Sequence, residues 1–240
     1  MAASGPAALT DLVVVAGHAV YMGREAGDPH DDWQWLLQPF QKGEPRFYVD
    51  HVRAGVGLAA ASSTALLVFS GGQTRREAGP RSEADGYLAL AGQHGWWGRL
   101  EVAERAATEA FARDSLENLL FGLCRFKECV GRYPDTVTVV SWGFKAARFD
   151  LHREALRWPA SRFTFVGIGE PADVDGARAG ESKTIERCRR DPYGTGADLG
   201  GKRAERNPFE GHAPYEVSCS DAAALLRHRG PELFDGALPW

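Results

Sequence analysis

Short apolar runs alternate with amphipathic segments along the first 170 residues of the chain. Four runs are mostly apolar, with no charged residue inside them, which predicts strands buried on both faces of a parallel sheet. These runs are residues 11–16, 65–69, 136–141 and 163–168. The segments with helical spacing are 47–61, 82–95, 115–133 and 146–158. Strands that alternate with helices predict an α/β fold with a mostly parallel central sheet and helices on both faces.

Other parts of the chain show weaker patterns. Residues 17–20 predict a further short strand, and 21–45 a long loop or lid that contains several tryptophans. Residues 96–112 are ambiguous: helical propensity is high over 102–111, and a short strand can precede it. From about residue 172 the pattern predicts two helices, over 173–189 and 218–229, with a glycine-rich loop between them. Because no linker separates this tail, we expect a single domain, with 171–240 packed as a helical and loop extension on the core of 11–170.

Composition narrows the range of functions. The 240 residues are 44% hydrophobic and carry a net charge of −4, which argues against binding to nucleic-acid phosphates. No apolar run reaches the roughly 20 residues of a membrane helix, and the first residues do not resemble a signal peptide. Four cysteines without a CxxC pair are typical of free thiols in a reducing compartment. We therefore expect a cytoplasmic protein with a small-molecule ligand, no membrane or nucleic-acid partner and no metal site; its oligomeric state is left open.

The stretch 65–83 has the strongest functional pattern. A buried strand ends at Ser70-Gly71-Gly72-Gln73-Thr74, where glycines permit a positive φ and a close approach to the main chain. Their N–H groups are candidate donors to an anion, and the hydroxyls of Ser70 and Thr74 are candidate ligand contacts, although a tight turn alone would explain both glycines. Ser82 is a natural N-cap of the helix that follows. Glu83 is then at a helix start, where the dipole would keep it ionised as a base or a hydrogen-bond acceptor, or as a plain cap.

Three other strand ends carry polar residues that we expect at the same edge of the sheet. Gly17-His18 follows the first strand, and His18 is a candidate acid/base or a structural histidine. Asp114, Ser115 and Asn118 resemble a helix cap, with Asn118 as a candidate ligand clamp. The predicted strand over 136–141 ends at Ser141, and Lys145 and Arg148 follow it. Paired cations at such an edge suit phosphate, sulfate or carboxylate, or form a solvated face.

These strand-end motifs together resemble the DUF218 family, in correct order over about residues 11–170. The residues that carry the resemblance are 13–18, 69–74, 82–84, 114–118 and 140–149. The tail, with 191–193 and 202–209, is similar to a eukaryotic, fungal branch of that family. The resemblance implies a Rossmann-like three-layer sandwich. It leaves the cofactor unknown and makes S-adenosylmethionine one candidate, because one type of family member is reported to bind it.

Three functions remain open at this point. The first is an enzyme for an anionic or nucleotide-like molecule, a hydrolase or transferase, with His18 or Glu83 as acid/base and Lys145 and Arg148 as anion contacts. The second is a binding module without turnover, for S-adenosylmethionine or a related nucleoside. The third is a scaffold that uses the Trp-rich loop and the tail to bind a partner. The chain has no GxGxxG, P-loop, HExxH or GxSxG motif, which disfavours the enzyme classes that use them.

Overall fold

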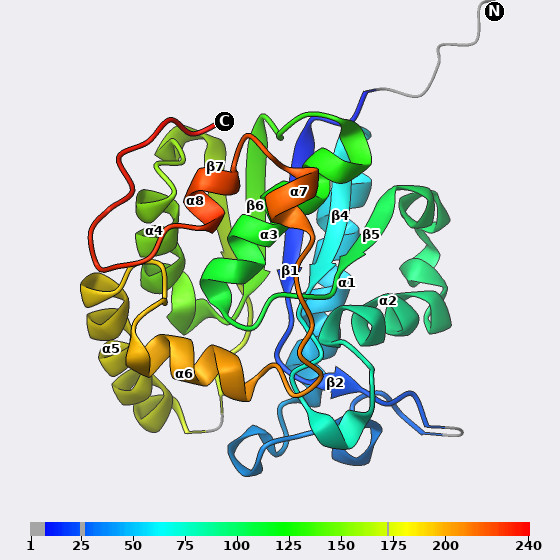
Figure 1. Cartoon of the computed structure of the whole chain (residues 1–240). Helices are drawn as coiled ribbons and strands as arrows, with labels where there is room; N and C mark the ends of the chain where they lie inside the picture. The colour runs from blue at the N-terminus through cyan, green and yellow to red at the C-terminus, as the bar shows by residue number, and fades with distance from the viewer. Residues whose placement is uncertain (1–7, 25–26, 172) are drawn as a thin grey trace, which may run out of the picture.

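A computed structural model of the protein describes residues 8–24, 27–171 and 173–240. Its centre is a five-stranded sheet in which all neighbouring strands are parallel, in the order β5-β4-β1-β6-β7 (Figure 1). The strands are β1 (Asp11–Ala16), β4 (Ala65–Ser70), β5 (Ala106–Glu109), β6 (Thr136–Ser141) and β7 (Phe163–Gly167). The α/β class and the parallel sheet predicted from the hydrophobic pattern are confirmed.

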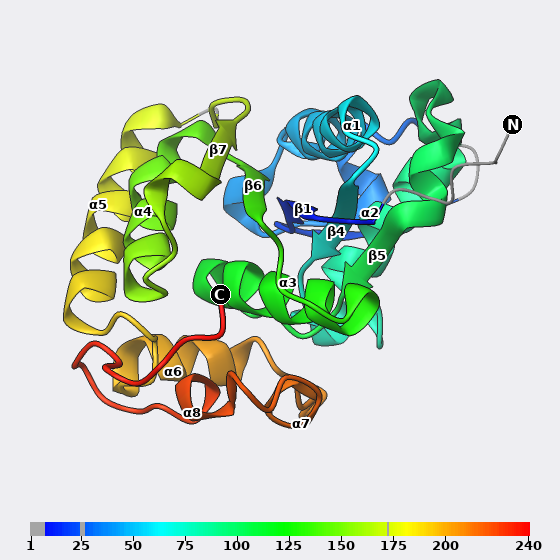
Figure 2. The same cartoon turned by 90° about the horizontal axis from the view of Figure 1, so that it is seen from above.

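Helices cover both faces of the sheet, as in a Rossmann-like three-layer sandwich (Figure 2). On one face lie α1 (Pro45–Ala61) and α2 (Glu83–Gln93), and on the other α3 (Ser115–Val130) and α4 (Ala146–Ala155). Alternate β1 side chains enter the two cores: Val15 packs on the α1 side and Val14 on the α3 side. Because both faces are buried, the strands need uninterrupted apolar residues, and such runs made the strands predictable from the sequence.

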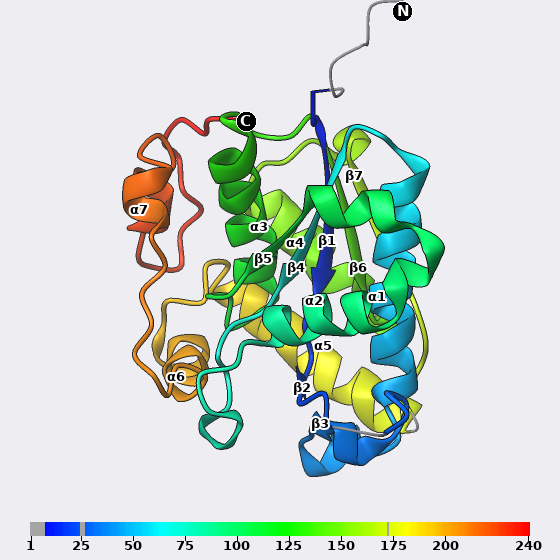
Figure 3. The same cartoon turned by 90° about the vertical axis from the view of Figure 1, so that its right-hand side faces the viewer.

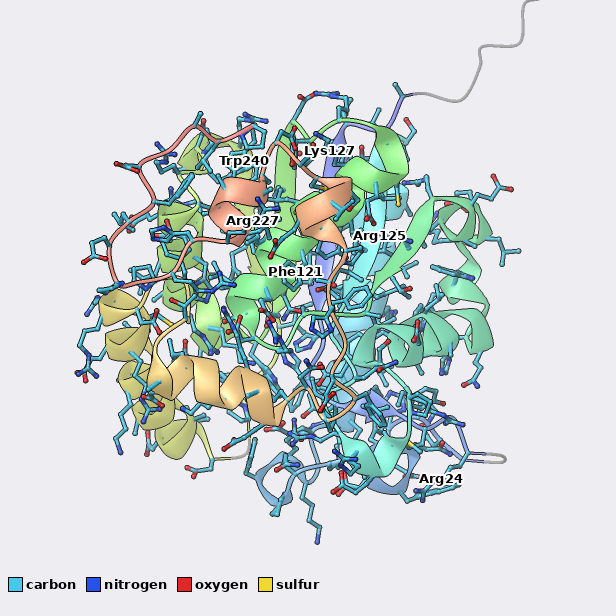
Figure 4. The ribbon with its side chains drawn as sticks, viewed as in Figure 1. Arg24, Phe121, Arg125, Lys127, Arg227 and Trp240 are labelled. Atoms are coloured by element: carbon cyan, nitrogen blue, oxygen red, sulfur yellow. The ribbon has the colours of Figure 1, made fainter. Side chains whose placement is uncertain are left out.

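The C-terminal segment lies against the α3 and α4 side of the sandwich. It contains α5 (Val174–Arg190), α6 (Ala197–Glu205), α7 (Tyr215–Ser218) and α8 (Ala223–Leu226). Figures 2 and 3 show α6 and α7 outside α3, as a further layer. Figure 4 shows Phe121 and Lys127 on the α3 face that this layer covers; the Phe121 ring lies 5.0 Å from Tyr215, and Lys127 pairs with Asp221. The tail thus packs on the core through apolar and charged contacts.

Two elements at the edges of the fold differ from the expectations. Residues 102–111 do not form an α-helix: the short 3-10 helices η4 (Gly95–Gly98) and η5 (Leu100–Arg105) lead into the edge strand β5. Arg105 Nη1 donates to the carbonyls of Ser62 and Ala65, which ties this segment to the start of β4. Pairing with the open edge of β4 therefore outweighs local helix propensity.

The other differences lie in the loops and the tail. Residues 197–205, predicted as a loop because of Gly200 and Gly201, form α6, and the helix predicted over 218–229 is replaced by the short α7 and α8. The strand predicted over 17–20 is only β2 (Val20–Tyr21), which pairs with β3 (Trp35–Leu36). A 3-10 helix, η2 (Pro39–Gln41), follows β3, so the predicted 21–45 loop is partly ordered. Within the described ranges, no helix combines the length and hydropathy needed to cross a bilayer.

Candidate functional site

A cavity of about 480 Å³ opens at the carboxyl edge of the sheet, the lower end of the sheet in Figure 1. It lies where the strand order reverses, with β4 and β5 on one side of β1 and β6 and β7 on the other. Ligands of open α/β sheets bind at such a point. Most of the residues expected at the strand ends line it together. They are Gly17, His18, Thr74, Glu83, Asp114, Ser115, Asn118, Ser141, Lys145 and Arg148.

His18 lies between a hydroxyl and an ammonium group at the end of β1. Its Nε2 is 3.4 Å from Ser141 Oγ, and its Nδ1 is 3.3 Å from Lys145 Nζ. Burial, and then the charge of Lys145, lower the pKa of His18 well below its ordinary value. The ring is therefore neutral. If Lys145 donates to Nδ1, the proton of the imidazole lies on Nε2 and points toward Ser141.

Lys145 is the residue before α4 and titrates in an unusual range. Burial, and then the neighbouring Arg148, lower its pKa to about 7. Arg148 Nε lies 3.0 Å from Glu181 Oε1 of α5, but the N–H is not aligned for a hydrogen bond. Lys145 thus switches between ammonium and amine near neutral pH, which suits an anion contact or a proton donor.

Glu83 faces the cavity from the first turn of α2. Thr74 Oγ1 donates to Glu83 Oε1 at 2.6 Å, and the residue is 9% exposed. Burial raises the pKa of Glu83, which acts against the ionisation expected from the helix dipole. The first N–H groups of α2, those of Glu83 and Ala84, are already bonded to the carbonyls of Gly72 and Gly71. Those bonds partly neutralise the positive end of the helix.

The glycines of the 70–74 turn do not offer their N–H groups to a ligand. Gly71 N donates to Glu109 O at 2.9 Å and Gly72 N to Ala112 O at 2.6 Å, and neither glycine has a positive φ. The predicted anion contact through Gly71 and Gly72 is therefore wrong. The reason for glycine here is space: a Cβ would lie 2.7 Å from Glu83 Oε2 at Gly71, and 2.5 Å from it at Gly17. Gly17 and Gly71 thus make room for the Glu83 side chain.

Asp114 and Ser70 have structural partners. Asp114 Oδ1 accepts from Glu117 N at 2.9 Å, as a helix cap does, and Oδ2 accepts from Arg203 Nε at 2.6 Å. Ser70 is fully buried and does not line the cavity, so its predicted ligand contact is wrong. Its Oγ lies 2.7 Å from Glu109 Oε2 and 2.8 Å from Asn118 Oδ1, which joins β4 to β5 and α3. Asn118 lines the cavity at 8% exposure.

Further cavity residues were not identified from the sequence. They include Phe40 of η2, which is 77% exposed, and Glu44, whose carboxylate accepts from Tyr48 Oη at 2.5 Å. Arg75 and Arg206 add two cations, and Arg206 comes from the end of α6 in the tail. Arg75 directly follows the predicted turn at 70–74, so its position in the sequence could have indicated it. For Arg206 no local signal existed, because its helix was itself predicted as a loop.

Comparison with known proteins yields one relative. An uncharacterized protein of Saccharomyces cerevisiae is 26% identical over a gapped alignment of length 262, which covers 85% of this chain and 86% of the yeast protein. This relative is consistent with the fungal affinity suggested by the tail. No family model matches the chain. No solved structure matches it either.

Proposed function

We propose that this protein is an enzyme that binds a small anionic, nucleotide-like molecule at the carboxyl edge of its sheet and hydrolyses or transfers a phosphate- or nucleoside-bearing group. One observation carries the proposal: His18, Glu83, Lys145 and Arg148 come from separate parts of the chain and line one cavity. The volume of about 480 Å³ is in the range of small-molecule sites. The perturbed pKa values of Glu83 and Lys145 are typical of catalytic groups.

The charge of the cavity favours an anion. The lining cations are Arg75, Arg113, Lys145, Arg148 and Arg206, and the lining acids are Glu44, Glu83, Asp114 and Asp173. Burial raises the pKa of both Glu44 and Glu83, which moves two of the acids toward their neutral form. Arg203 further offsets the charge of Asp114. Arg75, Lys145 and Arg206 offer positive charge to a phosphate group, whereas Arg113 and Arg148 share theirs with Glu117 and Glu181. The aromatic rings of Phe40 and Phe144 at the same cavity offer faces for a base.

The first prediction concerns affinity. A thermal-shift screen against nucleotides, phosphosugars and S-adenosylmethionine is expected to find a ligand that stabilises the wild-type protein by about 2.7 kcal/mol at a hundredfold excess over Kd. Lys145→Met is expected to remove most of this shift, whereas the matched change at the exposed Lys183 leaves it intact. Because the Lys145 ammonium contacts the anion, affinity should fall as pH rises through about 7. A ligand-induced thermal shift that is equal in Lys145→Met and in the wild type, and that does not change with pH, would contradict the anion contact.

The second prediction concerns turnover. His18→Asn and Glu83→Gln are expected to lower the rate of product formation by about 10²–10⁴-fold, the usual contribution of an acid or base, without loss of folding. Neutral His18 is available as a base, and the raised pKa of Glu83 favours its role as an acid. Chromatography of each stabilising ligand after incubation, with circular dichroism of the variants, measures both quantities. If S-adenosylmethionine or a nucleoside stabilises the wild type but no product forms, the protein is a binding module and not an enzyme.

We also propose that the chain is a divergent member of the DUF218 family. Four of its motifs in order support this, and each of them supplies at least one residue to one cavity. An experimental structure of an established member tests the proposal. Equivalent strand ends should superpose at 17–18, 70–74, 114–118 and 141–148, and a different strand order would exclude membership.

A further inference from the structure

A serine and a histidine form a hydrogen-bonded pair at the wall of the cavity. Ser115 is the first residue of α3, and its Oγ lies 2.8 Å from Nε2 of His152 on α4. Ser115 is partly exposed and lines the cavity, whereas His152 is only 3% exposed. Burial lowers the pKa of His152 to about 3, so the imidazole is neutral in the resting protein. With its proton on Nδ1, Nε2 accepts the hydroxyl hydrogen of Ser115.

We propose that Ser115 is a nucleophile of this protein and His152 its general base, in phosphoryl transfer from a phosphate ester. This inference rests on the proposed function of the same cavity. A serine hydroxyl becomes nucleophilic when a base within hydrogen-bond reach removes its proton, which is the arrangement found here. None of the residues assigned above to acid/base chemistry belongs to this pair.

The surroundings support each partner of the reaction. Lys145 and Arg148 line the cavity with Ser115 and would contact the equatorial oxygens of a phosphoryl group. The charge of Asp114, the residue before Ser115, favours the imidazolium that forms when His152 takes a proton. A purely structural serine–histidine pair would not need its hydroxyl to open on this cavity.

The chemical step needs only Ser115, His152, Lys145 and water. Ser115 Oγ forms a bond to phosphorus while the bond from phosphorus to the leaving oxygen breaks, and the hydroxyl proton passes to His152 Nε2. The leaving oxygen takes a proton from the Lys145 ammonium, whose pKa of about 7 suits that transfer. Water then attacks the phosphoserine and gives a proton to the Lys145 amine. Ser115 leaves as alkoxide, recovers its proton from His152, and phosphate is released.

The test uses a fluorophosphonate ester as probe, with intact mass spectrometry and peptide mapping of the whole chain. We expect one adduct on Ser115 in the wild type, none in Ser115→Ala, and labelling about 100-fold slower in His152→Asn. The exposed His212 provides the matched histidine-to-asparagine control, which should label at the wild-type rate. Adduct on Ser141 instead, or equal rates in wild type and His152→Asn, would overturn the assignment.

A second variant covers the case in which His152→Asn does not fold. Ser115→Cys keeps the shape of the pair, and a thiol beside His152 should react with iodoacetamide at least about 10-fold faster than the exposed Cys129 of the same molecule. Equal reactivity of the two thiols would remove the role of His152. The thermal-shift screen separates this inference from the proposed function: a wild type that is stabilised by an anionic ligand but is not labelled overturns the nucleophile alone. A wild type that shows neither result overturns both.

Discussion

Replacing Arg203 with methionine is expected to lower the free energy of unfolding by about 3–5 kcal/mol, the usual cost of removing one partner from a buried ion pair. Arg203 Nε donates to Asp114 Oδ2 at 2.6 Å and lies 3.4 Å from Glu117 Oε1, and Nη1 donates to Tyr193 O at 2.7 Å. The side chain is 12% exposed and that of Glu117 only 5%. Methionine has a similar volume, but it removes the guanidinium that pairs with the Asp114 carboxylate.

The matched control is Arg227→Met. Arg227 pairs with Glu216 at 2.8 Å, but its side chain is 65% exposed, so we expect a change of at most about 1 kcal/mol. Urea denaturation of both variants, followed by circular dichroism, measures the difference. Equal midpoints for the two variants would show that the Arg203 pair is no more important than a surface one.

The same ion pair predicts a pH dependence. Burial alone would raise the pKa of Asp114, but the charge and hydrogen bond of Arg203 outweigh it and hold that pKa well below its usual range. A carboxyl with a depressed pKa in the folded state contributes stability that is complete above its unfolded value, about 3.9, and is lost as pH falls through the folded value. As pH falls below about 4, the free energy of unfolding of the wild type should therefore decrease more steeply than that of Arg203→Met. The reason is that acid protonates Asp114 and breaks its pair with Arg203 in the wild type, whereas the variant has no such pair to break.

Replacing Gly71 with alanine is expected to cost about 1–3 kcal/mol, as overpacking of a full interior usually does. The new Cβ would lie 2.7 Å from Glu83 Oε2 and 2.8 Å from Glu83 Cβ. The carboxylate can rotate away, but the Cβ of Glu83 is fixed to the backbone of α2. The start of α2 must therefore shift, which also strains the bonds from Gly71 N to Glu109 O and from Ala84 N to Gly71 O.

Gly92→Ala is the matched control for this prediction. Gly92 lies near the end of the same helix, α2, and a Cβ there would have no neighbouring atom within 4 Å. Alanine should stabilise the protein by roughly 0.5–1 kcal/mol, because it is the better helix former. The two changes are chemically identical, so opposite signs in chemical denaturation would locate the cost at the contact with Glu83. If Gly71→Ala were as stable as Gly92→Ala, the backbone of the turn would accommodate the added Cβ with no loss of stability.

The nature of the strand ends was predictable where local chemistry is sufficient. Ser82 accepts from Asp85 N and Asp114 from Glu117 N, as the expected caps of α2 and α3. The gathering of His18, Ser141 and Lys145 at one edge also followed from the strand pattern, because parallel strands bring their carboxyl ends to the same edge. No such rule names the side chain that a residue will meet from a distant segment. The Arg148–Glu181 and Ser115–His152 contacts were therefore not foreseen.

The amino-acid sequence by itself determined the α/β class, the buried strands and the edge at which polar residues gather, because apolar periodicity is a local pattern and strands joined by helical crossovers run parallel. Tertiary structure alone decided how those residues are used. It directed the N–H groups of Gly71 and Gly72 to Glu109 and Ala112 rather than to a ligand, and it buried Glu83 deeply enough to raise its pKa. It also brought Arg206 from the tail to the cavity. Desolvation and long-range pairing depend on the whole packed chain, and for that reason they cannot be read from any one stretch of it.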